Sequence, residues 1–188
     1  MLAVRWLSPD ASLEASLVIR VTDVVNRAYE PAGDGLWSEP LRRTTLEGTF
    51  EAVAAGAVAV AEIGGEIVGA VRSQRDGGTA WFEMLAVDPS HAGRGVGTAL
   101  VTFVEDEARS GGARTMELEV LSADPPLAYL GRLAAWYTRR GYREVSRTRL
   151  ASSPTSERPA LIVTCDAVLM RRFLPAPADP RATCGPMG

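Results

Sequence analysis

Apolar residues recur every three or four positions in several stretches of the chain, the spacing that places them on one face of a helix. This pattern predicts helices over residues 13–29, from about residue 38 or 45 to 55, over 96–108 and near 127–140. In the third of these segments the apolar face consists of Val96, Ala99, Leu100, Phe103, Val104 and Ala108.

Shorter apolar or alternating runs predict strands around these helices. The expected strands cover residues 2–7, 57–63, 66–75, 81–87, 115–121, 142–150 and 161–173. The second and third are joined by Gly64-Gly65, a dipeptide suited to a tight hairpin turn. After an amino-terminal helical portion the order is ββαβαβ, which predicts an α/β (α+β) fold with a mixed sheet between helices.

Length and composition favour one domain. With 188 residues, of which 46% are hydrophobic, the chain can bury a substantial core but is short for two domains. We expect residues 1–174 to form that domain. Residues 175–188 contain four prolines and little to bury, so a flexible carboxy-terminal tail is expected there.

Charge and cysteine content narrow the function classes. All 20 basic residues are arginine and the formal net charge is −3, which argues against a strongly basic nucleic-acid binder. No apolar run is long enough for a membrane span, and Arg5, Asp10 and Glu14 interrupt the amino terminus, so a cytoplasmic protein is expected. One histidine and the two cysteines, Cys165 and Cys184, support neither a disulfide framework nor a metal site.

Three alternating glycines lead from the 81–87 strand into the following helix. Gly93, Gly95 and Gly97 allow the backbone to turn tightly, and the amide groups of a first helical turn can bind an anion such as pyrophosphate. The absence of lysine excludes a P-loop. A dinucleotide fingerprint would need a third glycine or alanine where Thr98 or Leu100 stands.

The segment Met84-Leu85-Ala86-Val87, then Asp88-Pro89, then Ala92-Gly93-Arg94-Gly95-Val96-Gly97 resembles the acetyl-coenzyme A motif of the GCN5-related N-acetyltransferases (GNAT). The resemblance implies a mixed, mostly antiparallel central sheet flanked by helices. It also implies that backbone groups at 85–87 align the pantetheine and polarise the thioester, while amides at 93–98 hold the pyrophosphate. Where the family has Gln or Arg, Ala92 keeps only the backbone amide, and Arg94 can restore positive charge. The coenzyme-binding residues implied are Leu85, Ala86, Val87, Ala92, Gly93, Arg94, Gly95, Val96, Gly97 and Thr98.

A second segment, Trp136-Tyr137-Thr138-Arg139-Arg140-Gly141-Tyr142, is similar to the family's Leu/Phe-Tyr-x-x-x-Gly-Phe signature. By this resemblance Tyr137 is the general acid that protonates the coenzyme thiolate; the alternative is a core aromatic residue. An asparagine frequent in the family is replaced by Leu130.

A general base is less clearly marked. Glu119 resembles the position of a catalytic glutamate in some family members. Glu83, which strand alternation places on the face opposite Met84, is the rival, and a water chain or no base at all stays open. Arg42 and Arg43 either meet an acidic acceptor or are solvated on a helix, and Trp37 either lines an acceptor pocket or anchors its loop.

The combined hypothesis is an acetyl-CoA-dependent N-acetyltransferase that transfers the acetyl group directly to a primary amine, without a metal. The alternative is a non-catalytic acyl-CoA-binding or sensing module, which the departures at Ala92 and Leu130 favour. The expected partners are a small-molecule amine or a protein or peptide amine, and a second copy in a homodimer; neither a membrane nor nucleic acid is expected.

Overall fold

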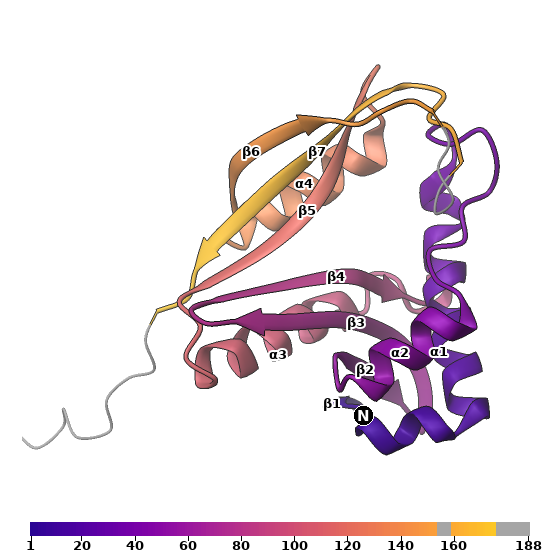
Figure 1. Ribbon diagram of the computed structural model, residues 1–188, viewed down its shortest axis with the longest axis vertical. Coiled ribbons are helices and arrows are strands. Elements are labelled where there is room, and N and C mark those ends of the chain that lie inside the picture. The colour runs from indigo at the N-terminus through magenta and orange to yellow at the C-terminus, as the bar shows by residue number, and fades with distance from the viewer. Residues whose placement is uncertain (154–158, 176–188) are drawn as a thin grey trace, which may run out of the picture.

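The computed structural model describes residues 1–153 and 159–175 (Figure 1). The helices and strands are β1 (Leu2–Trp6), η1 (Pro9–Leu13), α1 (Ala15–Tyr29), η2 (Pro31–Gly33), α2 (Leu46–Ala54), β2 (Val58–Ile63), β3 (Glu66–Asp76), β4 (Thr79–Val87), η3 (Pro89–His91), α3 (Val96–Ser110), β5 (Thr115–Asp124), α4 (Ala128–Arg139), β6 (Arg143–Arg149) and β7 (Thr164–Phe173).

The strands form one seven-stranded sheet in the order β1-β2-β3-β4-β5-β7-β6. Every neighbouring pair is antiparallel except β4 and β5, which are parallel. The predicted fold class, a mixed and mostly antiparallel sheet flanked by helices, is thus confirmed. None of the helices in the described ranges is long and apolar enough to cross a membrane.

Two large hydrophobic clusters cover the two faces of the sheet. One joins α1 and α2 to β2 and β3, and the other joins α3 and α4 to β4, β5 and β7. Figure 1 shows α3 beneath β3 and β4, and α4 against β5 and β7. A third cluster lies where β5 ends, between the start of α4 and the loops before α2 and β7.

Glycine permits a close approach between α3 and the sheet. A Cβ atom at Gly69 would lie 2.9 Å from the Ala86 carbonyl oxygen and 3.0 Å from side-chain carbons of Val96 and Leu100. Since real Cβ atoms do not come so close to backbone, a side chain at position 69 would push α3 away from β3. This contact sets the position of the helix that follows the glycine-rich loop.

A bulge in β4 reverses which side chains face which helices. Ala70 lies opposite Ala86 and Arg72 opposite Glu83, so one residue of β3 faces two of β4, and Met84 has a φ of 52°. Before the bulge Phe82 belongs to the α3–α4 cluster, whereas after it Leu85 packs on that side and Ala86 joins the α1–α2 cluster. Regular alternation predicted that Glu83 and Met84 face apart. In the structure Glu83 is exposed and Met84 is buried, and both residues line the same two cavities.

The parallel pair β4–β5 is short. Thr79–Trp81 pairs with residues 115–117, and beyond that point the two strands diverge (Figure 1). Among residues 1–153 and 159–175, no strand pairs with the β5-facing edge of β4 along residues 83–87, and a gap separates the two strands there.

Some predicted boundaries shift in the structure. The second helix begins at Leu46, because the Thr45 side chain accepts a hydrogen bond from the Gly48 amide at 3.0 Å and caps it. The last strand begins at Thr164 rather than 161, because Leu161 instead forms an isolated bridge with Trp37. The predicted tail lies outside the described residues except for Pro175.

Candidate active site

The loop between β4 and α3 is fixed at its first residue. The Asp88 carboxylate accepts hydrogen bonds from the Ser90 amide (3.0 Å) and hydroxyl (2.6 Å). Its other oxygen lies 2.9 Å from a guanidinium nitrogen of Arg27 on α1. The hydrogen bonds from Ser90 hold the pKa of Asp88 below its usual value, so the carboxylate is charged at neutral pH. His91 contacts the Ser90 hydroxyl through Nδ1 at 2.9 Å and belongs to the same turn.

The glycines of the loop adopt left-handed backbone conformations. Gly93 has a φ of 74° and Gly95 a φ of 82°. A Cβ atom at either position would meet nothing within 4 Å, so the backbone conformation, not lack of space, favours glycine there. The exposed surface of this loop is formed by Ala92, Gly93, Arg94 and Gly95.

The start of α3 presents unpaired amide groups. The Ala99 amide donates to the Gly95 carbonyl at 2.9 Å. By helix geometry the amides of Val96, Gly97 and Thr98 precede the first intrahelical bond and point out of the helix. The positive end of the helix dipole adds to them, so this turn suits an anion. The Val96 side chain is buried in the core, which leaves only its amide to act.

A cavity of about 160 Å³ lies at the gap between β4 and β5. It is lined by Glu83, Leu85, Glu119 and Tyr137, together with Tyr29 at the end of α1. The structure thus brings together both predicted carboxylates, the predicted acid and the β4 segment that precedes the glycine-rich loop.

Tyr137 both packs in the core and lines this cavity. Its side chain is 4% exposed, and its ring centroid lies 4.8 Å from that of Trp136, 5.7 Å from Tyr142 and 6.0 Å from Phe82. Burial raises the pKa of Tyr137, and the nearby Tyr29 adds to the rise while Arg140 opposes it. The phenol is therefore protonated at neutral pH, as a proton donor must be.

The two glutamates differ in their surroundings. Glu83 is paired with Arg72 at 3.1 Å and with Arg43 at 3.4 Å. Glu119 lines the cavity wall from β5, and within the described ranges no guanidinium pairs with it. Of the two carboxylates, Glu119 is the one whose oxygens are not already engaged by cations.

A larger cavity of about 540 Å³ adjoins the first and shares Tyr29, Glu83, Met84 and Glu119 with it. Its outer wall is formed by residues of the segment before α2 and of α4. Trp37 lines this cavity and also bridges to Leu161, which anchors the loop that carries it. Arg42 and Arg43 line it too, and neither lies on a helix.

Two site residues, Tyr29 and Tyr129, were missed by sequence reasoning. Tyr29 lines both cavities, and the Arg43 guanidinium lies 5.5 Å from its ring centroid. Burial raises the pKa of Tyr29, and the positive charge of Arg43 opposes this. The Tyr129 hydroxyl is buried without a hydrogen-bond partner in the described part of the chain, and burial raises its pKa. For Tyr29 the sequence gives one signal of a site residue, since it ends the apolar face of the helix predicted over residues 13–29.

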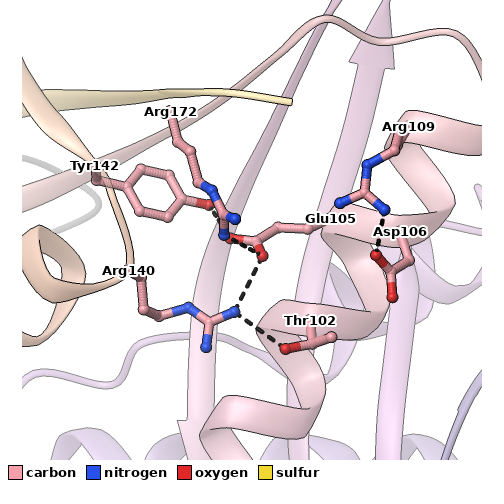
Figure 2. A network of polar contacts seen from close by, with 7 residues as sticks. All are labelled: Thr102, Glu105, Asp106, Arg109, Arg140, Tyr142 and Arg172. Carbon is pink, nitrogen blue, oxygen red and sulfur yellow. Dashed lines mark hydrogen bonds and ion pairs between the residues drawn. The ribbon is translucent and has the colours of Figure 1, made fainter. Parts of the chain in front are cut away.

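A buried polar network holds α3 against the end of α4 (Figure 2). Glu105, 3% exposed, accepts hydrogen bonds from Arg172 (2.7 Å), Arg140 (3.0 Å) and the Tyr142 hydroxyl (2.8 Å). Arg140 also reaches the Thr102 hydroxyl at 3.1 Å. The network ties α3, the helix that follows the glycine-rich loop, to the end of α4, the helix that carries Tyr137.

No group of three or more histidine, cysteine, aspartate or glutamate side chains is arranged to hold a metal ion among residues 1–153 and 159–175.

Comparison with known proteins gives one family and many similar folds. The model of the acetyltransferase (GNAT) family matches residues 21–142. The ribosomal-protein-S18-alanine N-acetyltransferase from Escherichia coli has a TM-score of 0.65 at 20% identity, over 96% of this chain and 97% of that one. No curated protein sequence matches the chain.

Two further structures were solved with the coenzyme. PaiA N-acetyltransferase from Thermoplasma acidophilum, in complex with coenzyme A, has a TM-score of 0.68 at 12% identity, over 92% of this chain and 99% of that one. YncA from Salmonella typhimurium, with acetyl-CoA, has a TM-score of 0.61 at 17% identity, over 95% and 97%.

Proposed function

This chain belongs to the acetyltransferase (GNAT) family and is an acyltransferase, and from that premise we propose that it transfers the acetyl group of acetyl-CoA directly to a primary amine. The observation that carries the proposal is that three features lie next to one another. The anion-binding turn of α3, the open edge of β4 and the cavity with Tyr137 and Glu119 follow one another along the gap between β4 and β5.

The donor fits the residues present. The amides of residues 93–98 would hold the pyrophosphate, with Arg94, exposed beside them, adding positive charge. Leu85, Ala86 and Val87 would align the pantetheine through backbone groups on the β4 edge, and an amide there would polarise the thioester carbonyl. When bound, acetyl-CoA supplies an activated acyl group and a thiolate leaving group.

Two side chains have the positions needed for proton transfer. Glu119 would accept a proton from the acceptor ammonium, directly or through a water molecule. The neutral amine then forms the new bond to the carbonyl carbon while the carbon–sulfur bond breaks. Tyr137 would donate its proton to the departing thiolate, and its raised pKa keeps that proton available. Glu83 is held by Arg43 and Arg72, which favours Glu119 as the base.

The surroundings of the Cys165 thiol favour direct transfer of the acetyl group to the amine. A two-step route would need a nucleophile within reach of the thioester. Cys165 is 1% exposed and packs in the third cluster, where it behaves as a small apolar side chain.

The test is calorimetric titration with acetyl-CoA followed, in the same sample, by thiol release on addition of amines. We expect binding and amine-dependent thiol release. Binding without release for any amine would instead identify a sensing module, and absence of binding would refute the assignment of the glycine-rich loop.

A matched pair of variants tests that loop. Asparagine and aspartate have the same shape and both tolerate a positive φ, so Gly95→Asn and Gly95→Asp differ mainly in charge. Gly95→Asp should abolish coenzyme binding, and Gly95→Asn should weaken it far less. Equal affinities in the two variants would contradict an anion-binding turn.

A further inference from the structure

The larger cavity contains one carboxylate and one guanidinium that no ion pair of the described residues engages. Glu119 lies on β5, and Arg42 lies in the segment before α2. The other two charged residues of the wall, Arg43 and Glu83, contact each other at 3.4 Å, and Glu83 is also held by Arg72 at 3.1 Å. An occupant with one positive and one negative group would therefore satisfy the two groups that remain.

Apart from the two tyrosines, Tyr29 and Tyr129, most of the remaining wall is apolar. It is formed by aliphatic and aromatic side chains from the segment before α2, from β5 and α4, and from Leu150, which directly follows β6. Those that face the body of an occupant include Leu36, Trp37, Leu41, Leu130, Leu133 and Leu150. A volume of about 540 Å³ is that of a small-molecule site, and such a wall stabilises an apolar body rather than a polar chain.

The balance of charge disfavours polycations. The cavity wall carries two guanidiniums, those of Arg42 and Arg43, and two carboxylates, those of Glu83 and Glu119, and Arg72 adds a third guanidinium that pairs with Glu83. A polyamine would place its additional ammonium groups near unneutralised positive charge, which is unfavourable. An acceptor that carries its own anionic group reverses that interaction.

We propose that the acceptor of this enzyme is a small amino acid with an apolar body, whose amine is received by Glu119 and whose carboxylate is bound by Arg42. This rests on the proposed function for the identity of the reaction, but its binding step can be measured without it. The amine end lies toward the smaller cavity, because Glu119 lines both cavities and Tyr137 lines the smaller one. The carboxylate end lies toward solvent, where Arg42 is exposed.

The experiment compares matched probes in the complex with coenzyme A, which carries no acetyl group and so permits binding without reaction. L-Leucine is compared with L-leucinamide, and 6-aminohexanoate with hexylamine, by calorimetry at about pH 6.5, where all four amines are protonated. Each pair differs in the carboxylate. We expect at least one carboxylate-bearing probe to bind about tenfold tighter than its partner, as a charge-assisted hydrogen bond would give.

Two arginine variants locate the effect. Arg42→Gln should remove the roughly tenfold advantage of the carboxylate and leave the affinity of the probe without a carboxylate little changed. Arg20→Gln, at an exposed position on α1 outside the cavity, should leave both affinities unchanged. Equal binding within both probe pairs, or the same result in the two variants, would overturn the proposal.

Thiol release from acetyl-CoA with the same four amines separates this proposal from the proposed function. Release with all amines and no preference for a carboxylate refutes amino-acid recognition and supports the transferase. Carboxylate-dependent binding that Arg42→Gln abolishes, without release, supports the recognition site and refutes the transferase.

Discussion

Replacing Glu105 by glutamine should destabilise the fold far more than the same change at its neighbour on α3. The carboxylate is 3% exposed and accepts three hydrogen bonds, two of them from guanidiniums (Figure 2). Glutamine keeps the shape but removes the negative charge. The Arg140 and Arg172 side chains, 15% and 28% exposed, would then keep positive charges without their anion.

The cost follows from those surroundings. Removing one partner of a buried ion pair typically destabilises a protein by about 3–5 kcal/mol. Because Arg172 keeps some access to water, we expect the lower end, about 3 kcal/mol. Asp106→Asn is the matched control, since Asp106 pairs with Arg109 at 2.7 Å and is 55% exposed. A surface pair of this kind contributes about 0–1 kcal/mol.

The assay is urea unfolding followed by tryptophan fluorescence, with free energies compared at equal m-values. Added salt should reduce the small effect of Asp106→Asn and leave that of Glu105→Gln nearly unchanged, because buried charges are poorly screened. If the two variants lose the same stability, Glu105 does not anchor α3 to α4 as described. Since Tyr137 lies on α4, we also expect Glu105→Gln to lower turnover more than coenzyme affinity.

Three further predictions concern single side chains around the site. The raised pKa of Tyr137 means that its acid form persists above the ordinary value of about 10, so the rate of thiol release should not fall between about pH 7 and 9.5; a falling limb there that Tyr137→Phe removes would show that the pKa of Tyr137 is not raised. Tyr129→Phe deletes a buried hydroxyl without a described partner and should raise the free energy of unfolding by about 1 kcal/mol, measured by urea unfolding; a loss would show that the hydroxyl has a partner in solution. Asp88→Asn should lower the free energy of unfolding by about 1 kcal/mol at neutral pH. Because the pKa of Asp88 is lowered in the folded state, this contribution is present above the pKa of the unfolded state and disappears as the pH falls. A difference in unfolding free energy between wild type and variant that stays the same at all pH values would refute it.

The sequence allowed prediction of those features that depend on local spacing. Helical periodicity predicted α1, α3 and α4, and short apolar runs predicted the strands, with errors of a few residues at most ends. The glycine-rich loop could be found because a positive φ strongly favours glycine, and Gly93, Gly95 and Gly141 all adopt one. Gly141 ends the helix of Tyr137, as its position in the signature indicates.

What could not be predicted depends on contacts between distant segments. Glu105 stands between Val104 and Asp106 on an ordinary amphipathic helix, and its partners are 35, 37 and 67 positions away. Nothing near it in the chain indicates that its carboxylate is buried. The same holds for Tyr29 and Arg43, whose contact depends on the path of the segment between α1 and α2.

The bulge at Met84 combines a feature that the sequence predicts, an apolar strand, with one that it does not, a distortion of that strand. The residues Met84-Leu85-Ala86-Val87 are an ordinary apolar run, and a non-glycine residue with a φ of 52° has no local signal there. Yet the bulge turns Leu85 toward the side of Tyr137 and leaves Glu83 and Met84 on the cavity walls. A regular strand would present alternate side chains to opposite faces and would keep β4 beside β5. The strained residue therefore lies where the sheet divides, and the cavity lined by Glu119 and Tyr137 lies at this division.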